Sequence, residues 1–198
     1  MDGSLYCWIN RLADRTGWAH GIFTAYARYG VALFALLLLA TYLQGRHDGE
    51  LRVVAGSVWA AGSALVALGI GQLIGSAVDR ARPYATMPAV HVLVDKSTDF
   101  SFPSDHATVV GAVAAGLLLT NRRWGIIAAV LAILMAFTRV YVGAHYPGDV
   151  LAGLALGAAV AAAGRPLIVP ILTRIAAALA RTPVRVLVSA SDSGAVTG

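Results

Sequence analysis

Long runs of apolar residues alternate with short polar stretches along most of the chain. Five of these runs approach the roughly 20 residues that an α-helix needs to cross a hydrocarbon layer of about 30 Å. They cover residues 26–44, 53–78, 104–120, 123–142 and 149–165. Glycine and alanine are frequent in them, and small residues allow membrane helices to pack closely. The pattern predicts an all-α, polytopic membrane helix bundle with five or six transmembrane helices.

Two further segments combine apolar residues with charges. Residues 5–22 mix aromatic and charged side chains at helical spacing, which predicts an N-terminal interfacial helix. Residues 167–181 are apolar, but Pro170 and Arg174 fall in the middle of them. A charge at the centre of a bilayer costs at least about 2.5 kcal/mol. We therefore expect a helix on the membrane surface there, and a sixth span is the alternative.

Composition agrees with a membrane protein, because 58% of the 198 residues are hydrophobic and 13% are charged. The formal net charge of +5 indicates membrane topology and anionic head groups as partners, not nucleic acid, since no basic run is interleaved with aromatic residues. Cys7 stands alone, which excludes an internal disulfide. No repeat or composition break divides the chain. We expect one membrane-embedded domain over residues 1–185 and a disordered tail over 186–198.

Three polar clusters stand at the ends of apolar runs: "RARP" at 80–83, "PSDH" at 103–106 and "RVYVGAHYPGD" at 139–149. The turn "TNRRW" at 120–124 returns the chain to the face it left, so all three clusters fall on one side of the membrane. Singly, they are typical of a basic stop after a span, a helix N-cap and a polar pair. Together they gather two histidines, arginines and acids at one membrane face. Ionisable groups in that position indicate a functional site.

The residue types in these clusters favour a phosphate ligand. The planar forks of Arg82 and Arg139 match phosphate oxygens, and a helix start at Ser104 adds a hydroxyl and free backbone amides. His145 has an attacking ring nitrogen if Asp149 fixes its tautomer. The chemistry also needs an acid, and His106 is placed to protonate the departing oxygen.

These roles predict two-step phosphoryl transfer through a phosphohistidine, with the cationic side chains stabilising the charged transition state. The sequence has no carboxylate cluster typical of a metal site. We therefore expect an activity that needs neither a metal nor another cofactor.

At these residues the chain resembles the type-2 phosphatidic acid phosphatase superfamily of membrane-embedded lipid phosphatases. The family pattern is Lys, six residues, Arg-Pro; Pro-Ser-Gly-His; and Ser-Arg, five residues, His, three residues, Asp. The segments 82–83, 103–106 and 138–149 match it in spacing. The resemblance implies a nucleophile, its carboxylate partner, an acid and three phosphate ligands. In that order they are His145, Asp149, His106, and Arg82, Ser104 and Arg139.

Three positions depart from the family pattern. The first-motif lysine falls at Gly75, so one phosphate ligand is missing, and Arg80 is the candidate substitute. Thr138 replaces serine. Asp105 replaces glycine, and "FPSDHAT", the short chain and "INRLADR" near its start are similar to the bacitracin-resistance type of undecaprenyl pyrophosphate phosphatase. That subgroup implies hydrolysis of undecaprenyl diphosphate to the monophosphate.

Basic residues predict the orientation, since cytoplasmic loops carry an excess of Lys and Arg. Apart from the proposed ligands Arg82 and Arg139, the site face carries five basic residues: Arg11, Arg15, Arg28, Arg80 and Lys96. The opposite face carries eight: Arg46, Arg52, Arg122, Arg123, Arg165, Arg174, Arg181 and Arg185. The bias places the site on the extracytoplasmic face, although the opposite count falls to seven if the last helix spans the membrane.

Other functions stay open at this point. The same site suits a phosphatase for phosphatidic acid, phosphatidylglycerol phosphate or another polyprenyl phosphate, or a phosphotransferase that delivers the phosphoryl group to a lipid. A transporter or packing subunit that binds a phosphorylated lipid without hydrolysing it is the non-enzymatic alternative. A panel of lipid phosphates and the variant His145→Ala separate these hypotheses.

Overall fold

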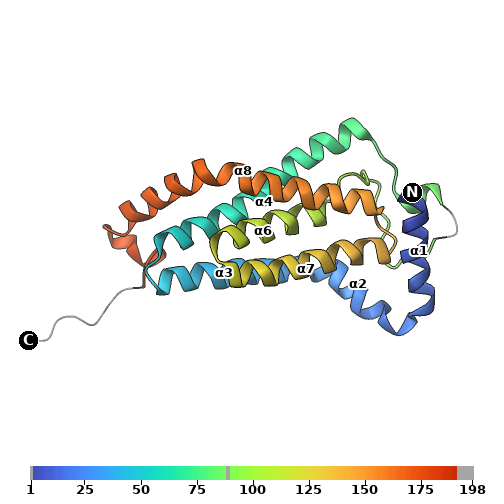
Figure 1. Cartoon of the computed structure of the whole chain (residues 1–198), viewed down its shortest axis with the longest axis horizontal. Helices are drawn as coiled ribbons and strands as arrows, with labels where there is room; N and C mark the ends of the chain where they lie inside the picture. Colours follow the sequence, from blue (N-terminus) through green and yellow to red (C-terminus); the bar gives the residue numbers. More distant parts are fainter. Residues whose placement is uncertain (1, 88–89, 191–198) are drawn as a thin grey trace, which may run out of the picture.

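The five apolar runs form the helices of one bundle, which Figure 1 shows as a computed structural model. The structure describes residues 2–87 and 90–190. Its main helices are α3 (Val31–His47), α4 (Leu51–Val78), α6 (Asp105–Thr120), α7 (Arg122–Tyr141) and α8 (Pro147–Leu179). The described part of the chain contains no strand. The prediction of an all-α membrane bundle is confirmed.

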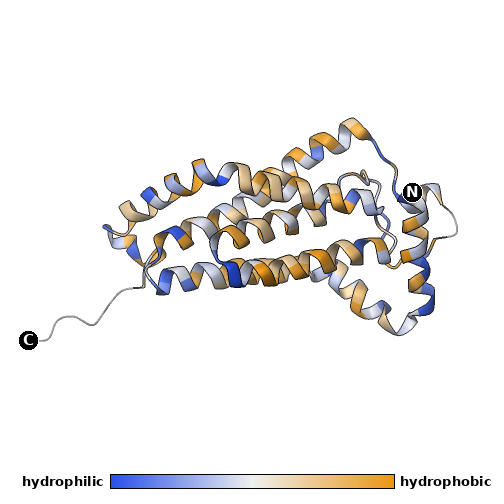
Figure 2. Ribbon diagram, in the orientation of Figure 1, coloured by the Kyte–Doolittle hydropathy of each residue, from blue (hydrophilic) through white to orange (hydrophobic). Residues whose placement is uncertain are grey.

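Hydropathy decides which helices are able to cross a bilayer. Three stretches are long and apolar enough: Leu51–Thr86, α7 and α8. A fourth candidate is the pair Gly17–Tyr29 and Val31–His47, which meet at a bend of 55°. Helix α6 is apolar but has only 16 residues. Apolar residues run along the middle of the bundle and polar residues gather toward its ends (Figure 2).

Helix α6 packs against α4, α7 and α8 and carries much of the buried core. Glycine makes the contact with α8 possible. A Cβ atom on Gly157 would lie 2.1 Å from the carbonyl oxygen of Thr108, and one on Gly153 would lie 2.6 Å from that of Ser104. Any larger residue would push the two helices apart. This close contact fixes the start of α6 beside the start of α8.

The N-terminal segment lies across one end of the bundle (Figure 1). Helix α1 (Asp2–Arg15) is followed by the short 3-10 helix η1 (Gly17–Ala19) and by α2 (His20–Tyr29). The sequence predicted one helix over 5–22, whereas the structure breaks it at Thr16. Helix α1 exposes Leu5, Trp8 and Leu12. Its apolar outer face suits an interfacial helix, and its placement at the membrane interface stays a prediction.

The expectation of a separate surface helix over 167–181 is wrong. Helix α8 runs through 33 residues without a break and contains Pro166 and Pro170. At a rise of about 1.5 Å per residue, Arg174 lies about 40 Å along the helix from Pro147. This distance exceeds the roughly 30 Å of a hydrocarbon core. A hydrocarbon core that begins at Pro147 therefore ends before Arg174, and the charge then gives no reason to expect a break.

The ordered chain also continues beyond the domain boundary expected at residue 185. The 3-10 helix η2 (Pro183–Leu187) follows α8, and Val188 is buried against Val54 and Ala176. The amide of Ala190 donates to the carbonyl oxygen of Arg46. Residues 186–190 therefore pack on the bundle. The rest of the predicted tail, 191–198, lies outside the described residues.

The connections at the α1 end of the bundle hold the three polar clusters. Residues 79–104 join α4 to α6 and include the single turn α5 (Pro83–Thr86). Residues 142–146 join α7 to α8, and Gly143 adopts φ +83°, a conformation that favours glycine. A Cβ atom there would also lie 2.3 Å from the carbonyl oxygen of His91. This tight turn directs His145 back into the bundle.

Candidate active site

A small polar cavity lies where the two connections meet, and its volume is about 170 Å³. This is about the volume of five or six liquid water molecules. Eleven residues line it: Arg82, Tyr84, Val94, Asp95, Ser97, Asp99, Asp105, His106, Arg139, Ala144 and His145. The predicted convergence of the three clusters is confirmed for Arg82, His106, Arg139 and His145. A phosphoryl group fits such a space, while a lipid tail has to lie outside it.

His145 is buried, and both of its ring nitrogens have defined neighbours. Nδ1 lies 2.8 Å from the carbonyl oxygen of Ser101, and Nε2 lies 3.2 Å from Nη1 of Arg82. A carbonyl oxygen only accepts and a guanidinium only donates, so both contacts require the proton on Nδ1. Nε2 therefore keeps its lone pair. Burial, followed by the charges of Arg139 and Arg82, holds the pKa of His145 well below its usual value.

The arginines supply the positive charge of the cavity. Nε and Nη2 of Arg82 donate to the carboxylate of Asp99, and Nη1 donates to the carbonyl oxygen of Ala144. Arg139 is also buried, and its Nε has no hydrogen-bond partner among the described residues. A buried donor without a partner is unfavourable. An anion in the cavity would relieve this.

Two residues at the start of α6 complete the predicted set. His106 stands in the first turn and lines the cavity. Ser104 precedes the helix, and its side chain makes no capping hydrogen bond. Its hydroxyl is buried and has no partner in the part of the chain that the structure describes. Ser104 does not belong to the cavity lining, so its role as a phosphate ligand stays a prediction.

Asp149 contacts His145 less directly than the sequence predicted. Its carboxylate lies 3.9 Å from Nδ1 of His145, which is too far for a hydrogen bond. One of its oxygens instead accepts from the hydroxyl of Ser101 and from the amide of Tyr146. Ser101 thus stands between the carboxylate and the imidazole. Sequence reasoning missed Ser101, because no motif marks it and its role depends on its backbone carbonyl.

Arg80 does not take the place expected for a substitute phosphate ligand. It is absent from the cavity lining, and its guanidinium binds two carboxylates. Nη1 lies 2.7 Å from Asp149, and Nη2 lies 2.6 Å from Asp2. These ion pairs engage both terminal nitrogens of the Arg80 guanidinium. The expectation for Arg80 is therefore corrected.

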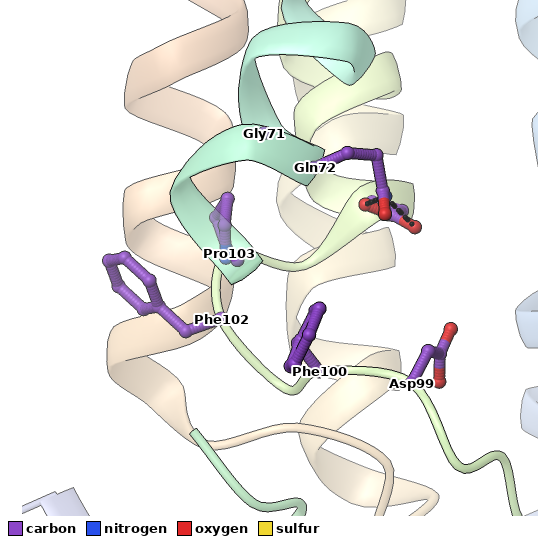
Figure 3. Close-up of a pocket in the computed structure, with 8 residues that line it drawn as sticks. Gly71, Gln72, Asp99, Phe100, Phe102 and Pro103 are labelled. Atoms are coloured by element: carbon purple, nitrogen blue, oxygen red, sulfur yellow. Dashed lines mark hydrogen bonds between the residues drawn. The ribbon is translucent and has the colours of Figure 1, made fainter. Parts of the chain in front are cut away.

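The position of the missing family lysine, Gly75, is covered by the connection between α4 and α6. A Cβ atom on Gly75 would lie 3.0 Å from the carbonyl oxygen of Phe102 and 3.3 Å from the ring of Phe100. A lysine there would displace this segment. Beside it, the amide of Gln72 donates to both carboxylate oxygens of Asp105 at 2.9 Å (Figure 3). Asp105, another of the three departures from the pattern, is thus held by α4.

The described residues include no group of three or more His, Cys, Asp or Glu side chains able to hold a metal ion. The cationic groups of this cavity are arginines, whose donors match phosphate oxygens. A buried neutral imidazole with an unprotonated Nε2 is a competent nucleophile toward phosphorus once the substrate takes the place of the Arg82 contact. The expectation that no metal or cofactor is needed stays a prediction.

Comparison with known proteins agrees with this chemistry. Residues 56–169 match the family model described as PAP2 superfamily. The undecaprenyl-diphosphatase BcrC of Bacillus subtilis is 30% identical over 154 residues, which cover 78% of this chain and 77% of the relative. The decaprenylphosphoryl-5-phosphoribose phosphatase of Mycobacterium tuberculosis is 45% identical over 155 residues, which cover 76% and 81%.

The fold also has a solved counterpart. A crystal structure of a transmembrane PAP2 type phosphatidylglycerolphosphate phosphatase from Bacillus subtilis superposes with a TM-score of 0.51. The two chains are 23% identical, and the match covers 90% of this chain and 88% of the other. The likeness shows that the two chains share the fold of the whole helix bundle.

Proposed function

Because the chain belongs to the PAP2 superfamily and is thereby a membrane lipid phosphatase, we propose that it hydrolyses undecaprenyl or another polyprenyl diphosphate to the monophosphate. The strongest support is the unprotonated Nε2 of buried His145, which lies 3.2 Å from Nη1 of Arg82 in a cavity of phosphate size. The undecaprenyl-diphosphatase relatives support the choice of substrate.

The proposed reaction has two steps, formation and hydrolysis of a phosphohistidine. Nε2 of His145 attacks the terminal phosphorus, the bond to the bridging oxygen breaks, and His106 gives a proton to that oxygen. Water then attacks the phosphohistidine, His106 takes a proton from it, and the bond from phosphorus to Nε2 breaks. Inorganic phosphate leaves. Arg82, Arg139 and Ser104 stabilise the charge on the equatorial oxygens in both steps.

A second candidate substrate is a sugar phosphate on a polyprenyl carrier. The relative that is 45% identical is a decaprenylphosphoryl-5-phosphoribose phosphatase. The cavity lining agrees with a sugar, since it includes three carboxylates, those of Asp95, Asp99 and Asp105. Carboxylate oxygens accept hydrogen bonds from hydroxyl groups but repel the second phosphate of a diphosphate. The chemistry at His145 is the same for both substrates.

We place the site on the extracytoplasmic face. The end of α8 supports this, because residue 190 hydrogen-bonds to Arg46 at the end of the bundle opposite the cavity. Arg174, Arg181 and Arg185 therefore count with the opposite face. That end has the larger number of basic residues and is cytoplasmic by the positive-inside rule. In a Cys7→Ala background, an impermeant thiol reagent should label Lys96→Cys in intact cells and spare Arg185→Cys, and the reverse pattern would contradict the orientation.

The test of function is a panel of lipids incubated with the purified protein in detergent with EDTA. The panel contains undecaprenyl diphosphate, a decaprenyl phosphoribose 5-phosphate, phosphatidic acid and phosphatidylglycerol phosphate. We expect phosphate release to be fastest from undecaprenyl diphosphate, and His145→Ala to abolish it. Preference for the sugar phosphate would select the second candidate. Release from none of the four would contradict both.

A further inference from the structure

We propose that helix α1 is part of the catalytic apparatus, through a chain of contacts in which Asp2, Arg80 and Ser101 position Asp149 and His145. This inference rests on the proposed function of His145 as the nucleophile. It makes Asp2, Arg80 and Ser101 positioning residues, because none of them lines the cavity and none contacts Nε2 of His145, the atom proposed to attack phosphorus. The sequence pattern of the family contains none of the three in these roles.

The chain of contacts begins at the first turn of α1. One carboxylate oxygen of Asp2 lies 2.6 Å from Nη2 of Arg80. The other accepts from the amide of Gly148 at 2.9 Å, in the first turn of α8. Asp2 therefore joins α1 both to the connection after α4 and to the helix that carries Asp149.

Arg80 forms the next link with both its side chain and its backbone. Nη1 lies 2.7 Å from Asp149, and the guanidinium stacks over the ring of Tyr146 with 4.1 Å between its central carbon and the ring centroid. The carbonyl oxygen of Arg80 accepts from the amide of Ser101 at 2.8 Å. One residue thus fixes the carboxylate and the serine relative to each other.

Ser101 closes the chain at the nucleophile. Its hydroxyl donates to Asp149, and its carbonyl oxygen accepts from Nδ1 of His145 at 2.8 Å. Ser101 is fully buried, so water does not compete for these bonds. The contacts run without a gap from Asp2 through Arg80, Asp149 and Ser101 to His145.

The charges along this chain depend on one another. The side chain of Asp149 is completely buried, and a buried carboxylate needs a partner to remain ionised. Arg80 supplies that partner. Asp2 supplies the second carboxylate that fills the fork of Arg80. Removing Asp2 frees Arg80 to turn away, and Asp149 and Ser101 then lose their orientation.

Further contacts hold α1 in the position that this role requires. Tyr6 is buried against Tyr146, with ring centroids 5.4 Å apart, and its hydroxyl donates to the carbonyl oxygen of Gly143 at 3.3 Å. The amide of Asn10 donates to the carbonyl oxygens of His91 and Tyr141. Helix α1 is therefore anchored to the turn that carries His145.

The test compares Asp2→Asn with Asp14→Asn in the full-length protein, tagged at the C-terminus so that the tag lies far from Asp2. Asp14 is a matched control, because it lies on the same helix and pairs with His91 at 2.8 Å but does not contact Asp149. Both variants are assayed on the lipid phosphate that the wild type hydrolyses fastest. Since a misplacement of about 1 Å costs about 100-fold in rate, we expect kcat to fall at least tenfold in Asp2→Asn. We expect KM to stay within about twofold, and Asp14→Asn to retain wild-type kcat.

Conservative replacements separate positioning from folding. Asp2→Glu keeps the charge and should have a higher kcat than Asp2→Asn. Ser101→Thr should have a higher kcat than Ser101→Ala, because it keeps the hydroxyl. In Arg80→Gln two carboxylates face each other without a cation. The double variant Arg80→Gln/Asp2→Asn should therefore lose less kcat than the product of the losses in the two single variants. Thermal unfolding in detergent, matched within a few degrees, shows that the variants compared are folded.

The outcomes are distinct. An inactive wild type contradicts the proposed function. An active wild type with Asp2→Asn and Ser101→Ala both at wild-type kcat overturns the positioning role and leaves the proposed function standing. Equal losses in Asp2→Asn and Asp14→Asn also overturn it, because they show a general effect of α1. If Asp2→Asn does not fold, the comparison of Ser101→Ala with Ser101→Thr decides, and equal kcat values overturn the proposal.

Discussion

Arg82 donates through Nε and Nη2 to the carboxylate of Asp99, at 3.1 and 2.8 Å. An acid of the protein thus occupies two of the donors that we propose for the substrate phosphate. Burial raises the pKa of Asp99, but hydrogen bonds from Ser97 and Arg82 outweigh it and leave the pKa below its usual value. Asp99 is therefore charged at neutral pH. If Arg82 binds the phosphate as we propose, we expect the substrate to displace this carboxylate.

The variant Asp99→Asn tests this exchange. The Asp99 side chain is 54% exposed, and exposed ion pairs contribute about 0.2 to 1 kcal/mol. We expect KM and the inhibition constant of inorganic phosphate to fall by up to about fivefold. Steady-state kinetics should show little change in kcat. A higher KM in Asp99→Asn would mean that Asp99 helps to hold the substrate.

Ser104→Ala tests the role of a hydroxyl that has no partner in the described residues. A hydrogen bond to a charged group contributes about 1.5 to 3 kcal/mol. We expect kcat/KM to fall by about 10- to 100-fold, while the melting temperature stays close to that of the wild type. Ser63→Ala is the control, because Ser63 is a buried hydroxyl in α4 far along the chain from the site. A large loss of stability in Ser104→Ala with unchanged kcat/KM would assign the hydroxyl to folding.

The lowered pKa of His145 sets a direction for pH dependence. The groups that face it are Arg82, Arg139, His106 and Asp149. Burial and the two arginines disfavour the imidazolium, so the ring stays neutral below pH 6.5, its ordinary pKa. The unfolded chain binds the proton first as the pH falls, and the free energy of unfolding therefore decreases below about pH 6.5.

Histidine NMR in detergent measures this directly, with His145→Ala to assign the signal. We expect the His145 ring to be neutral at pH 6.5 and to titrate at a lower pH. Half-protonation at or above pH 6.5 would contradict the electrostatic account of the cavity.

Much of the fold follows from the sequence alone, because apolar runs long enough to cross a bilayer have few alternatives to helices. The spacing of Arg82, His106, Arg139 and His145 also sufficed to bring them to one cavity. The sequence did not predict the continuity of α8, since Pro170 and Arg174 fall in the middle of the apolar run 167–181 but in the last third of the 33-residue helix that contains it. The local pattern of residues does not show where a helix begins, and therefore not how deep in the membrane a given residue lies.

The supporting residues of the site were not predictable in the same way. Ser101 acts through its carbonyl oxygen as well as its hydroxyl, and Asp2 meets Arg80 across 78 residues of sequence. Arg80 was assigned to phosphate from its charge, whereas two carboxylates take its donors. Such roles depend on which hydrogen-bond partners lie within reach of a side chain in the folded protein. That choice is made by tertiary packing, not by residue type.

The central claim is that the phosphoryl group passes through Nε2 of His145. The most direct measurement is to mix the enzyme with undecaprenyl diphosphate labelled in its terminal phosphate, quench in alkaline detergent within the first turnover, and locate the label by peptide mass spectrometry. The account predicts label on His145 in the wild type and none in His145→Ala. Turnover with no label on His145, or label that persists in His145→Ala, would contradict it.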